Sequence, residues 1–109
     1  MSRSLRLSRS AERDIEEARR WYAEEAPHME MALGEEIDAT LQRIADHSKL
    51  YQRVEGEVRR AVLRRFPFSV FYREVSDWIE IVSVVHQARD PRTWQERIAR
   101  PQGRGSCSP

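Results

Sequence analysis

Three consecutive runs rich in Val, Ile, Phe, Tyr and Trp constrain the fold of this chain more than any other feature. The runs cover Val58–Arg65, Ser69–Val75 and Trp78–His86, and their composition is typical of β-strands. Phe66-Pro67-Phe68 predicts the first turn, because Pro67 has no backbone N–H to donate to a neighbouring strand. Ser76-Asp77 predicts a short hairpin between the last two runs. Together the runs predict an antiparallel meander.

The last of these runs is apolar on both of its faces. With a period of two, one face carries Ile79, Ile81 and Val85, and the opposite face carries Trp78, Val82 and Val84. A strand that is apolar on both faces needs cover on both. This pattern predicts that the last strand lies centrally in its sheet.

The residues before the meander are patterned as a short strand and a helix. Ser4–Leu7 places two leucines on one face, as a strand of period two does. A helix then begins at an N-cap, Ser8 or Ser10, and runs to about Glu25. Its apolar residues recur at spacings of four, three and four, which is the pattern of an amphipathic helix: Ala11, Ile15, Ala18 and Tyr22.

A second helix is predicted directly after the first. Pro27 suits its first turn, where the missing N–H would have no partner in any case. The helix continues to near His47, and its apolar face is formed by Leu33, Ile37, Leu41 and Ile44. Two helices joined this tightly form a hairpin whose apolar stripes need a partner surface, and the meander provides one.

The predicted fold is therefore α+β, with an N-terminal strand and an α-helical hairpin packed against an antiparallel sheet in the order βααβββ. A short C-terminal helix, Arg92–Ile98, follows, with Asp90 as N-cap and Pro91 at its start. The last residues are rich in Pro, Gly and Ser. We expect a single domain over residues 1–98 and a disordered tail over residues 99–109.

Composition argues against a membrane-spanning protein and against a secreted, disulfide-bonded one. No run approaches the roughly 20 apolar residues that span a bilayer, and residues 1–10 lack the apolar block of a signal peptide. The lone cysteine, Cys107, cannot form an internal disulfide, so we expect a cytoplasmic protein. The three histidines are far apart and the glycines do not precede a helix. We therefore expect neither a metal nor another cofactor.

Charge is distributed unevenly along the chain. Residues 1–50 carry eight basic and eleven acidic residues, and residues 51–109 carry eleven and seven. The basic residues of the first two runs have no acid among them until Glu74: Arg59, Arg60, Arg64, Arg65 and Arg73. They predict either a surface for a polyanion or an acidic protein segment, or a solvated sheet rim whose arginines lie over apolar neighbours.

The stretch from Val58 to Trp94 resembles the RelE/ParE superfamily, the toxins of type II toxin–antitoxin modules. It is most similar to the ParE branch, whose members are often called plasmid stabilisation proteins. The resemblance covers roughly residues 5–98, including the helix that begins at Ser10. The matching motifs are Arg60, Phe66-Pro67-Phe68, Phe71-Tyr72-Arg73, Val84-Val85-His86, Arg89-Asp90-Pro91 and Trp94.

The resemblance implies the architecture predicted above and a protein partner. A cognate antitoxin would wrap the toxin with a flexible, acidic C-terminal segment and hold it inactive in a heteromeric complex. ParE-like members act on DNA gyrase without chemistry of their own, and RelE-like members cleave mRNA on the ribosome. We expect a gyrase inhibitor that arrests growth. For contact with the target or the antitoxin, the predicted residues are Arg60, Arg65, Arg73, His86 and Arg89, with Trp94 in support.

Two alternatives stay open. As a ribosome-dependent endoribonuclease, the protein would use Glu57 as base, Arg60 as phosphate clamp and His86 as acid. Against this, the predicted sheet has no lysine, no tyrosine follows Tyr72, and Gln87 follows His86 where a related nuclease subgroup has a terminal tyrosine. His86 could instead have no catalytic role and be a polar residue at the end of the last strand, hydrogen-bonded to the Arg-Asp-Pro turn that follows. The other alternative is a relic that binds its antitoxin but has lost toxicity.

Overall fold

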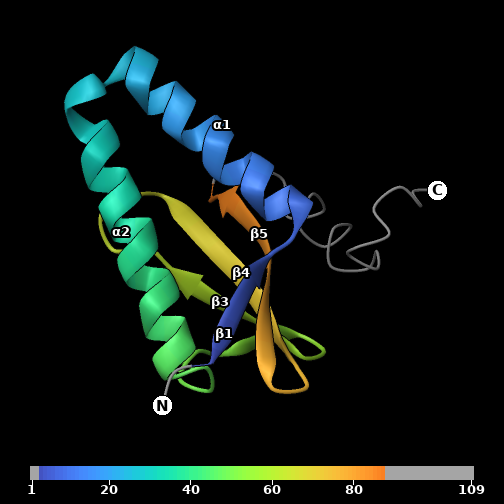
Figure 1. Ribbon diagram of the computed structural model, residues 1–109. Helices are drawn as coiled ribbons and strands as arrows, with labels where there is room; N and C mark the ends of the chain where they lie inside the picture. Colours follow the sequence, from blue (N-terminus) through green and yellow to red (C-terminus); the bar gives the residue numbers. More distant parts are fainter. Residues whose placement is uncertain (1–2, 88–109) are drawn as a thin grey trace.

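Two helices lie side by side across one face of a five-stranded sheet (Figure 1). The structure is a computed structural model that describes residues 3–87. Its elements are β1 Ser4–Leu7, α1 Arg9–Glu25, α2 Pro27–Asp46, β2 Arg53–Glu55, β3 Val58–Val62, β4 Phe68–Val75 and β5 Trp78–His86. The α+β class and the order of its elements are confirmed. The predicted helix Arg92–Ile98 and tail 99–109 lie outside the described residues.

Helix α1 begins at Arg9, with Ser8, one of the two predicted N-caps, directly before it. The Ser8 hydroxyl accepts a hydrogen bond from the Ala11 N–H at 3.0 Å and donates to the Val82 carbonyl at 2.8 Å. The first bond satisfies an N–H that has no partner within the helix, and the second fastens the start of α1 to β5. The buried stripe of α1 consists of Ala11, Asp14 and Ala18, so small residues let this helix lie close to the sheet.

Helix α2 follows after one linking residue, Ala26, with Pro27 in its first turn as predicted. Leu33, Ile37 and Ile44 are buried, and each such side chain contributes about 1.5–3 kcal/mol to folding. The helix ends at Asp46 with His47 as its C-cap. No helix within residues 3–87 combines the length and the apolar character needed to cross a membrane.

The sheet has the strand order β1-β5-β4-β3-β2. β3, β4 and β5 form the predicted antiparallel meander, and β5 lies in the interior of the sheet between β1 and β4. β1, however, pairs with β5 in parallel, from Ser4 opposite Trp78 to Leu7 opposite Ile81. The sheet is therefore mixed, and the predicted wholly antiparallel sheet was wrong on this point. The sequence could not show this, because alternation within a strand carries no information about the direction of its neighbour.

One strand was not predicted, and another ends earlier than predicted. β2 has three residues and charged ends, too short for a recognisable pattern, and it reaches β3 through a turn in which Gly56 has φ +56°. β3 ends at Val62 rather than Arg65, since the Leu63 N–H donates to the Phe68 carbonyl at 3.0 Å and closes the connection there.

A β-bulge interrupts the pairing of β4 with β5. Phe71 pairs with Ser83. The next residue of β4, Tyr72, pairs with Ile81, so Val82 is an extra residue in β5. The bulge shifts the alternation of every β5 residue that follows it.

The bulge explains which residues face the helices. Val84 joins Ile79 and Ile81 in the core beneath the helices, whereas Val85 lies with Val82 in a second buried cluster. We call the sheet face that carries this second cluster the outer face. Its buried apolar residues are Val58, Phe71, Val82 and Val85. Apolar cover on both faces of β5 is confirmed, but the predicted sides of Val84 and Val85 were wrong, because strict alternation cannot anticipate an extra residue.

The loop between α2 and β2 is held to the sheet by charged and polar groups. Glu74 accepts hydrogen bonds from the Ser48 hydroxyl at 2.6 Å and the Lys49 ammonium at 2.8 Å, and Arg3 lies 3.2 Å from the same carboxylate. The Tyr72 hydroxyl donates to the Ser48 carbonyl at 2.7 Å. Chiefly through the hydrogen bonds from Lys49 and Ser48, the pKa of Glu74 falls to about 2.

Candidate functional site

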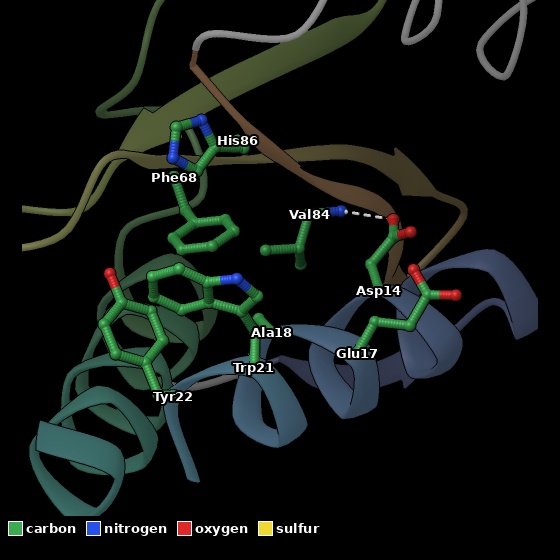
Figure 2. Close-up of a pocket in the computed structure, with 8 residues that line it drawn as sticks. All are labelled: Asp14, Glu17, Ala18, Trp21, Tyr22, Phe68, Val84 and His86. Carbon is green, nitrogen blue, oxygen red and sulfur yellow. Dashed lines mark hydrogen bonds between the residues drawn. The ribbon is translucent and has the colours of Figure 1, made fainter. Parts of the chain in front are cut away.

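A cleft lies between α1 and the neighbouring ends of β4 and β5. Its volume is about 530 Å³, and its lining residues are Asp14, Glu17, Ala18, Trp21, Tyr22, Phe68, Val84 and His86. Figure 2 shows the rings of Trp21, Tyr22, Phe68 and His86 gathered toward one end and the two carboxylates toward the other. We call this feature the α1–β5 cleft. Its volume is within the range typical of ligand pockets.

The aromatic end of the cleft is built from rings that meet edge to face. The centroids of Trp21 and Tyr22 lie 4.9 Å apart, and those of Phe68 and His86 lie 5.1 Å apart. Tyr22 also contacts Phe68, at 6.5 Å. Trp21 is 56% exposed despite its size, and so large an apolar side chain at the mouth of a cleft is typical of a contact surface.

The acidic end of the cleft is attached to β5. Asp14 is buried, and its Oδ2 accepts a hydrogen bond from the Val84 N–H at 2.9 Å (Figure 2). Glu17 follows three residues later on α1 and is exposed, so both carboxylates lie on the same side of the helix. The cleft therefore presents negative charge beside aromatic faces, an environment that favours a cation.

The outer face carries basic residues instead. Arg60 on β3 pairs with Phe71 on β4, and Arg73 follows two residues later on the same side of β4. Arg60 and Arg73 are thus diagonal neighbours, which are about 7–8 Å apart in an antiparallel pair. The Arg73 guanidinium pairs with Glu80 at 2.8 Å. Arg60 is exposed and has no ion pair within residues 3–87.

Arg6 extends this basic surface to the edge of the sheet. Arg6 on β1 is in register with Glu80 on β5, and its guanidinium lies 4.5 Å from the centre of the Trp78 ring. A guanidinium stacked on an indole is held in place while its N–H donors face outward. The outer face therefore presents Arg6, Arg60 and Arg73 around an apolar cluster.

Arg65, by contrast, is tied to helix α2. Its Nε donates to Glu36 at 3.1 Å, and the same carboxylate accepts hydrogen bonds from the backbone N–H groups of Arg64 and Arg65. Burial raises the pKa of Glu36, but the hydrogen bonds and charge of Arg65 and the N–H of Arg64 outweigh it, so the pKa lies below its usual value. Arg65 contributes to the turn, and its charge is largely compensated.

The structure brings together only some of the residues predicted for the site. Arg60 and Arg73 share the outer face, whereas His86 lines the α1–β5 cleft beneath α1. Glu57 lies in the turn before β3, 3.6 Å from Arg53. Arg89 and Trp94 lie outside the described residues. Within residues 3–87, no group of three or more His, Cys, Asp or Glu side chains converges to hold a metal.

Sequence reasoning missed the acidic and aromatic wall that α1 contributes. Trp21 lies one residue before Tyr22, at the edge of the apolar stripe rather than in it. A tryptophan at that position was a signal that could have been used, because a surface helix rarely exposes so large a ring without a contact to make. Glu17 offered no signal, since exposed glutamates are common on such helices.

Comparison with known proteins extends these observations. The family model described as "ParE toxin of type II toxin-antitoxin system, parDE" matches residues 5–91. The chain belongs to the ParE toxin family. The resemblance predicted from the sequence is thereby confirmed, and the protein is a toxin of a type II toxin–antitoxin system.

Individual relatives of this ParE-family toxin support the assignment. Toxin ParE2 of Mycobacterium tuberculosis, from strains CDC 1551 / Oshkosh and H37Rv, is 29% identical over 100 residues, which cover 91% of this chain and 95% of the relative. The match therefore spans both the α1–β5 cleft and the outer face, so both surfaces belong to the part of the chain that the family shares.

Two solved structures share the fold of this ParE-family toxin. The chromosomal ParDE system of P. aeruginosa matches with a TM-score of 0.68 and 21% identity, over 78% of this chain and 96% of that one. The RelBE2 toxin–antitoxin complex of Mycobacterium tuberculosis matches with a TM-score of 0.54 and 14% identity, over 79% and 99%. At these identities the likeness concerns the fold, which both branches of the superfamily have in common.

Proposed function

We propose that this ParE-family toxin inhibits DNA gyrase in the cytoplasm by binding alone, and that a cognate antitoxin holds it inactive. The observation that carries the proposal is the separation of the residues required by the nuclease alternative. General acid–base cleavage needs its groups within hydrogen-bond reach of one substrate. Glu57, Arg60 and His86 do not converge in that way.

The sheet register gives the size of this separation. The β4 partners of Arg60 and His86 are Phe71 and Phe68, which are about 10 Å apart along the strand. The two side chains also lie on opposite sides of the sheet, since Arg60 shares the outer face with Phe71 and His86 lines the cleft. Glu57 precedes β3, farther still from His86. This arrangement favours action by binding over cleavage of RNA.

The basic outer face supports an acidic partner. Arg6, Arg60 and Arg73 lie around the apolar cluster of the outer face, and the exposed Val62 follows Arg60 two residues later on the same side of β3. An amphipathic acidic segment of an antitoxin could place carboxylates on these arginines and an apolar side chain on Val62. Among the sequence-predicted contacts, Arg60 and Arg73 fit this role, and we propose Arg65, His86, Arg89 and Trp94 as further contacts of the antitoxin or the target.

Supercoiling by purified gyrase, titrated with the purified toxin and scored for trapped cleaved DNA, tests this function. We expect loss of supercoiling together with trapped cleavage, and a weaker effect from Arg60→Ala. Folded toxin without effect on gyrase would contradict the proposal. Cleavage of ribosome-bound mRNA that His86→Ala abolishes would then assign the RelE-type activity, and normal growth at verified soluble expression would indicate a non-toxic relic.

A further inference from the structure

We propose that the α1–β5 cleft binds an arginine side chain presented by a segment of a partner protein. The proposal goes beyond the toxin's proposed action on gyrase, and it does not depend on which macromolecule the toxin inhibits. It rests on the two chemically different ends of the cleft, one aromatic and one acidic (Figure 2), and on the exposed carboxylate of Glu17, which has no ion pair within residues 3–87.

The aromatic end suits a planar cation. Trp21 leaves more than half of its surface exposed beside Tyr22 and Phe68. A guanidinium stacks on an indole or phenyl face and keeps its N–H donors free at its edge, whereas the ammonium of lysine acts as a point charge with stronger hydration. Stacking would also cover the exposed face of Trp21. The aromatic end therefore favours arginine over lysine.

The acidic end supplies a carboxylate for those N–H donors. Glu17 is exposed and has no ion pair within residues 3–87. Two nearby basic residues of α1 are engaged elsewhere, since Arg19 pairs with Glu30 at 2.7 Å and Arg20 with Glu16 at 3.4 Å. Arg13, four residues before Glu17, is exposed and forms no ion pair with it within residues 3–87. Asp14 lies three residues earlier on the same side of the helix, where it is buried and accepts a hydrogen bond from the Val84 N–H. An arginine in the cleft would be held between an aromatic face and a carboxylate.

The Glu17 carboxylate also disfavours other occupants. A phosphate or an acidic side chain would meet this carboxylate, and like charges at close range are unfavourable. The cleft is also larger than one guanidinium, so its apolar floor at Ala18 and Val84 can accept an apolar neighbour of the arginine. The occupant that fits is a short segment with an arginine beside leucine or a similar residue.

A titration followed by NMR tests the proposal on the full-length toxin. The probe is the peptide acetyl-Ala-Leu-Arg-Leu-Ala-amide, and the matched peptide carries citrulline, which has nearly the same shape as arginine but no charge. The readout is the indole N–H resonance of Trp21, assigned with the Trp21→Phe variant. We expect the arginine peptide to shift this resonance saturably, and the citrulline peptide to bind at least about fivefold more weakly.

Variants of α1 separate the contribution of the Glu17 charge from that of the Trp21 ring. Glu17→Gln removes one charge at an exposed position, so the toxin should stay folded and bind the arginine peptide about threefold more weakly. Glu24→Gln makes the same change on the same helix outside the cleft and should leave the affinity unchanged. Because the Trp21 variants lack the indole, their binding is followed by the backbone amide resonances of Glu17 and Ala18. Trp21→Ala should weaken binding about tenfold, and Trp21→Phe should retain most of the affinity.

Several results would overturn the proposal. Equal binding of the arginine and citrulline peptides would mean that the cleft recognises shape alone. Equal effects of Glu17→Gln and Glu24→Gln would mean that only net charge matters. Binding seen only after Arg89→Ala would assign the cleft to an arginine of the toxin itself. None of these outcomes depends on the result of the gyrase assay.

Discussion

Glu74 joins three separate parts of the chain around one carboxylate: Arg3 before β1, Ser48 and Lys49 after α2, and its own strand. Its folded-state pKa of about 2 is below the ordinary value of 4.5. The stabilisation it provides is therefore fully present above pH 4.5 and is lost as the pH falls toward 2.

Replacing Glu74 by Gln should reduce the free energy of unfolding by about 2 kcal/mol at pH 7, because the hydrogen bonds from Lys49 and Ser48 lose their ionised acceptor. Urea unfolding of both proteins measures the difference, which should shrink between pH 4 and pH 2 as the wild-type carboxylate is protonated. Glu55→Gln, at an exposed position of β2, should change little. A difference that is constant down to pH 2 would contradict this account.

Ser83, on β5 of the same sheet, lacks the hydrogen bonds that Glu74 makes. Its hydroxyl is fully buried and has no hydrogen-bond partner within the described part of the chain. Ser83→Ala should therefore leave stability unchanged or raise it by up to about 1 kcal/mol, since the desolvation penalty of the hydroxyl disappears. Ser48→Ala, which removes a hydroxyl bonded to Glu74, should destabilise in the same urea assay. Clear destabilisation by Ser83→Ala would reveal a partner for the hydroxyl.

The connection from β3 to β4 is an element whose geometry depends on one helix residue. Glu36 accepts from two successive backbone N–H groups and from the side chain of Arg65, so it holds this connection against α2. The fixed connection in turn positions Phe66 and Phe68 beneath α1, where both rings contact Tyr22.

Glu36→Gln should therefore speed amide hydrogen exchange at Arg64 and Arg65 by about tenfold or more. The variant should keep the exchange rates of β5 close to those of the wild type, because β5 is held by its own ladder. Glu35→Gln, at the neighbouring exposed residue, is the matched control. Unchanged exchange at Arg64 and Arg65 would mean that packing, rather than this carboxylate, holds the connection.

Prediction from sequence was reliable for elements and weaker for how they combine. The stripe from Ala11 to Tyr22, the proline at the start of α2 and the apolar runs of the meander are local signals, and the elements they predict are present. Strand β2 is too short to show a pattern, the bulge at Val82 breaks the alternation of β5, and the parallel pairing of β1 depends on a partner distant in sequence. The α1–β5 cleft was missed for the same reason, because Trp21 and His86 are 65 residues apart and only the packing of α1 on β5 places them together.

At the scale of the whole molecule, the uneven charge along the sequence becomes two surfaces of opposite sign. The acidic first half contributes Asp14 and Glu17 to the α1–β5 cleft, and the second half contributes Arg60 and Arg73 to the outer face. A partner that engages both would need acidic residues in one part and a basic residue in another. This requirement narrows the choice of partner more than either surface does alone.

Arg60→Glu should weaken binding of the antitoxin about tenfold at low salt, because it places a negative charge on the outer face opposite an acidic segment. Calorimetric titration with the purified antitoxin measures the affinity. Arg13→Glu makes the same charge change at an exposed position of α1 outside the described cleft and outer face, and it should have a small effect. Equal losses in the two variants would show that the antitoxin responds to net charge rather than to the outer face.

The parallel pairing of β1 with β5 also has a consequence for synthesis. The contacts that secure the start of the chain reach across 74 residues from Ser8 to Val82 and across 70 from Asp14 to Val84. Such contacts form only after a long loop has closed, so β1 has no partner strand until the last strand has been translated. A ribosome that stops before residue 78 releases a chain without β5, in which neither β1 nor β4 has the strand that joins them in the sheet.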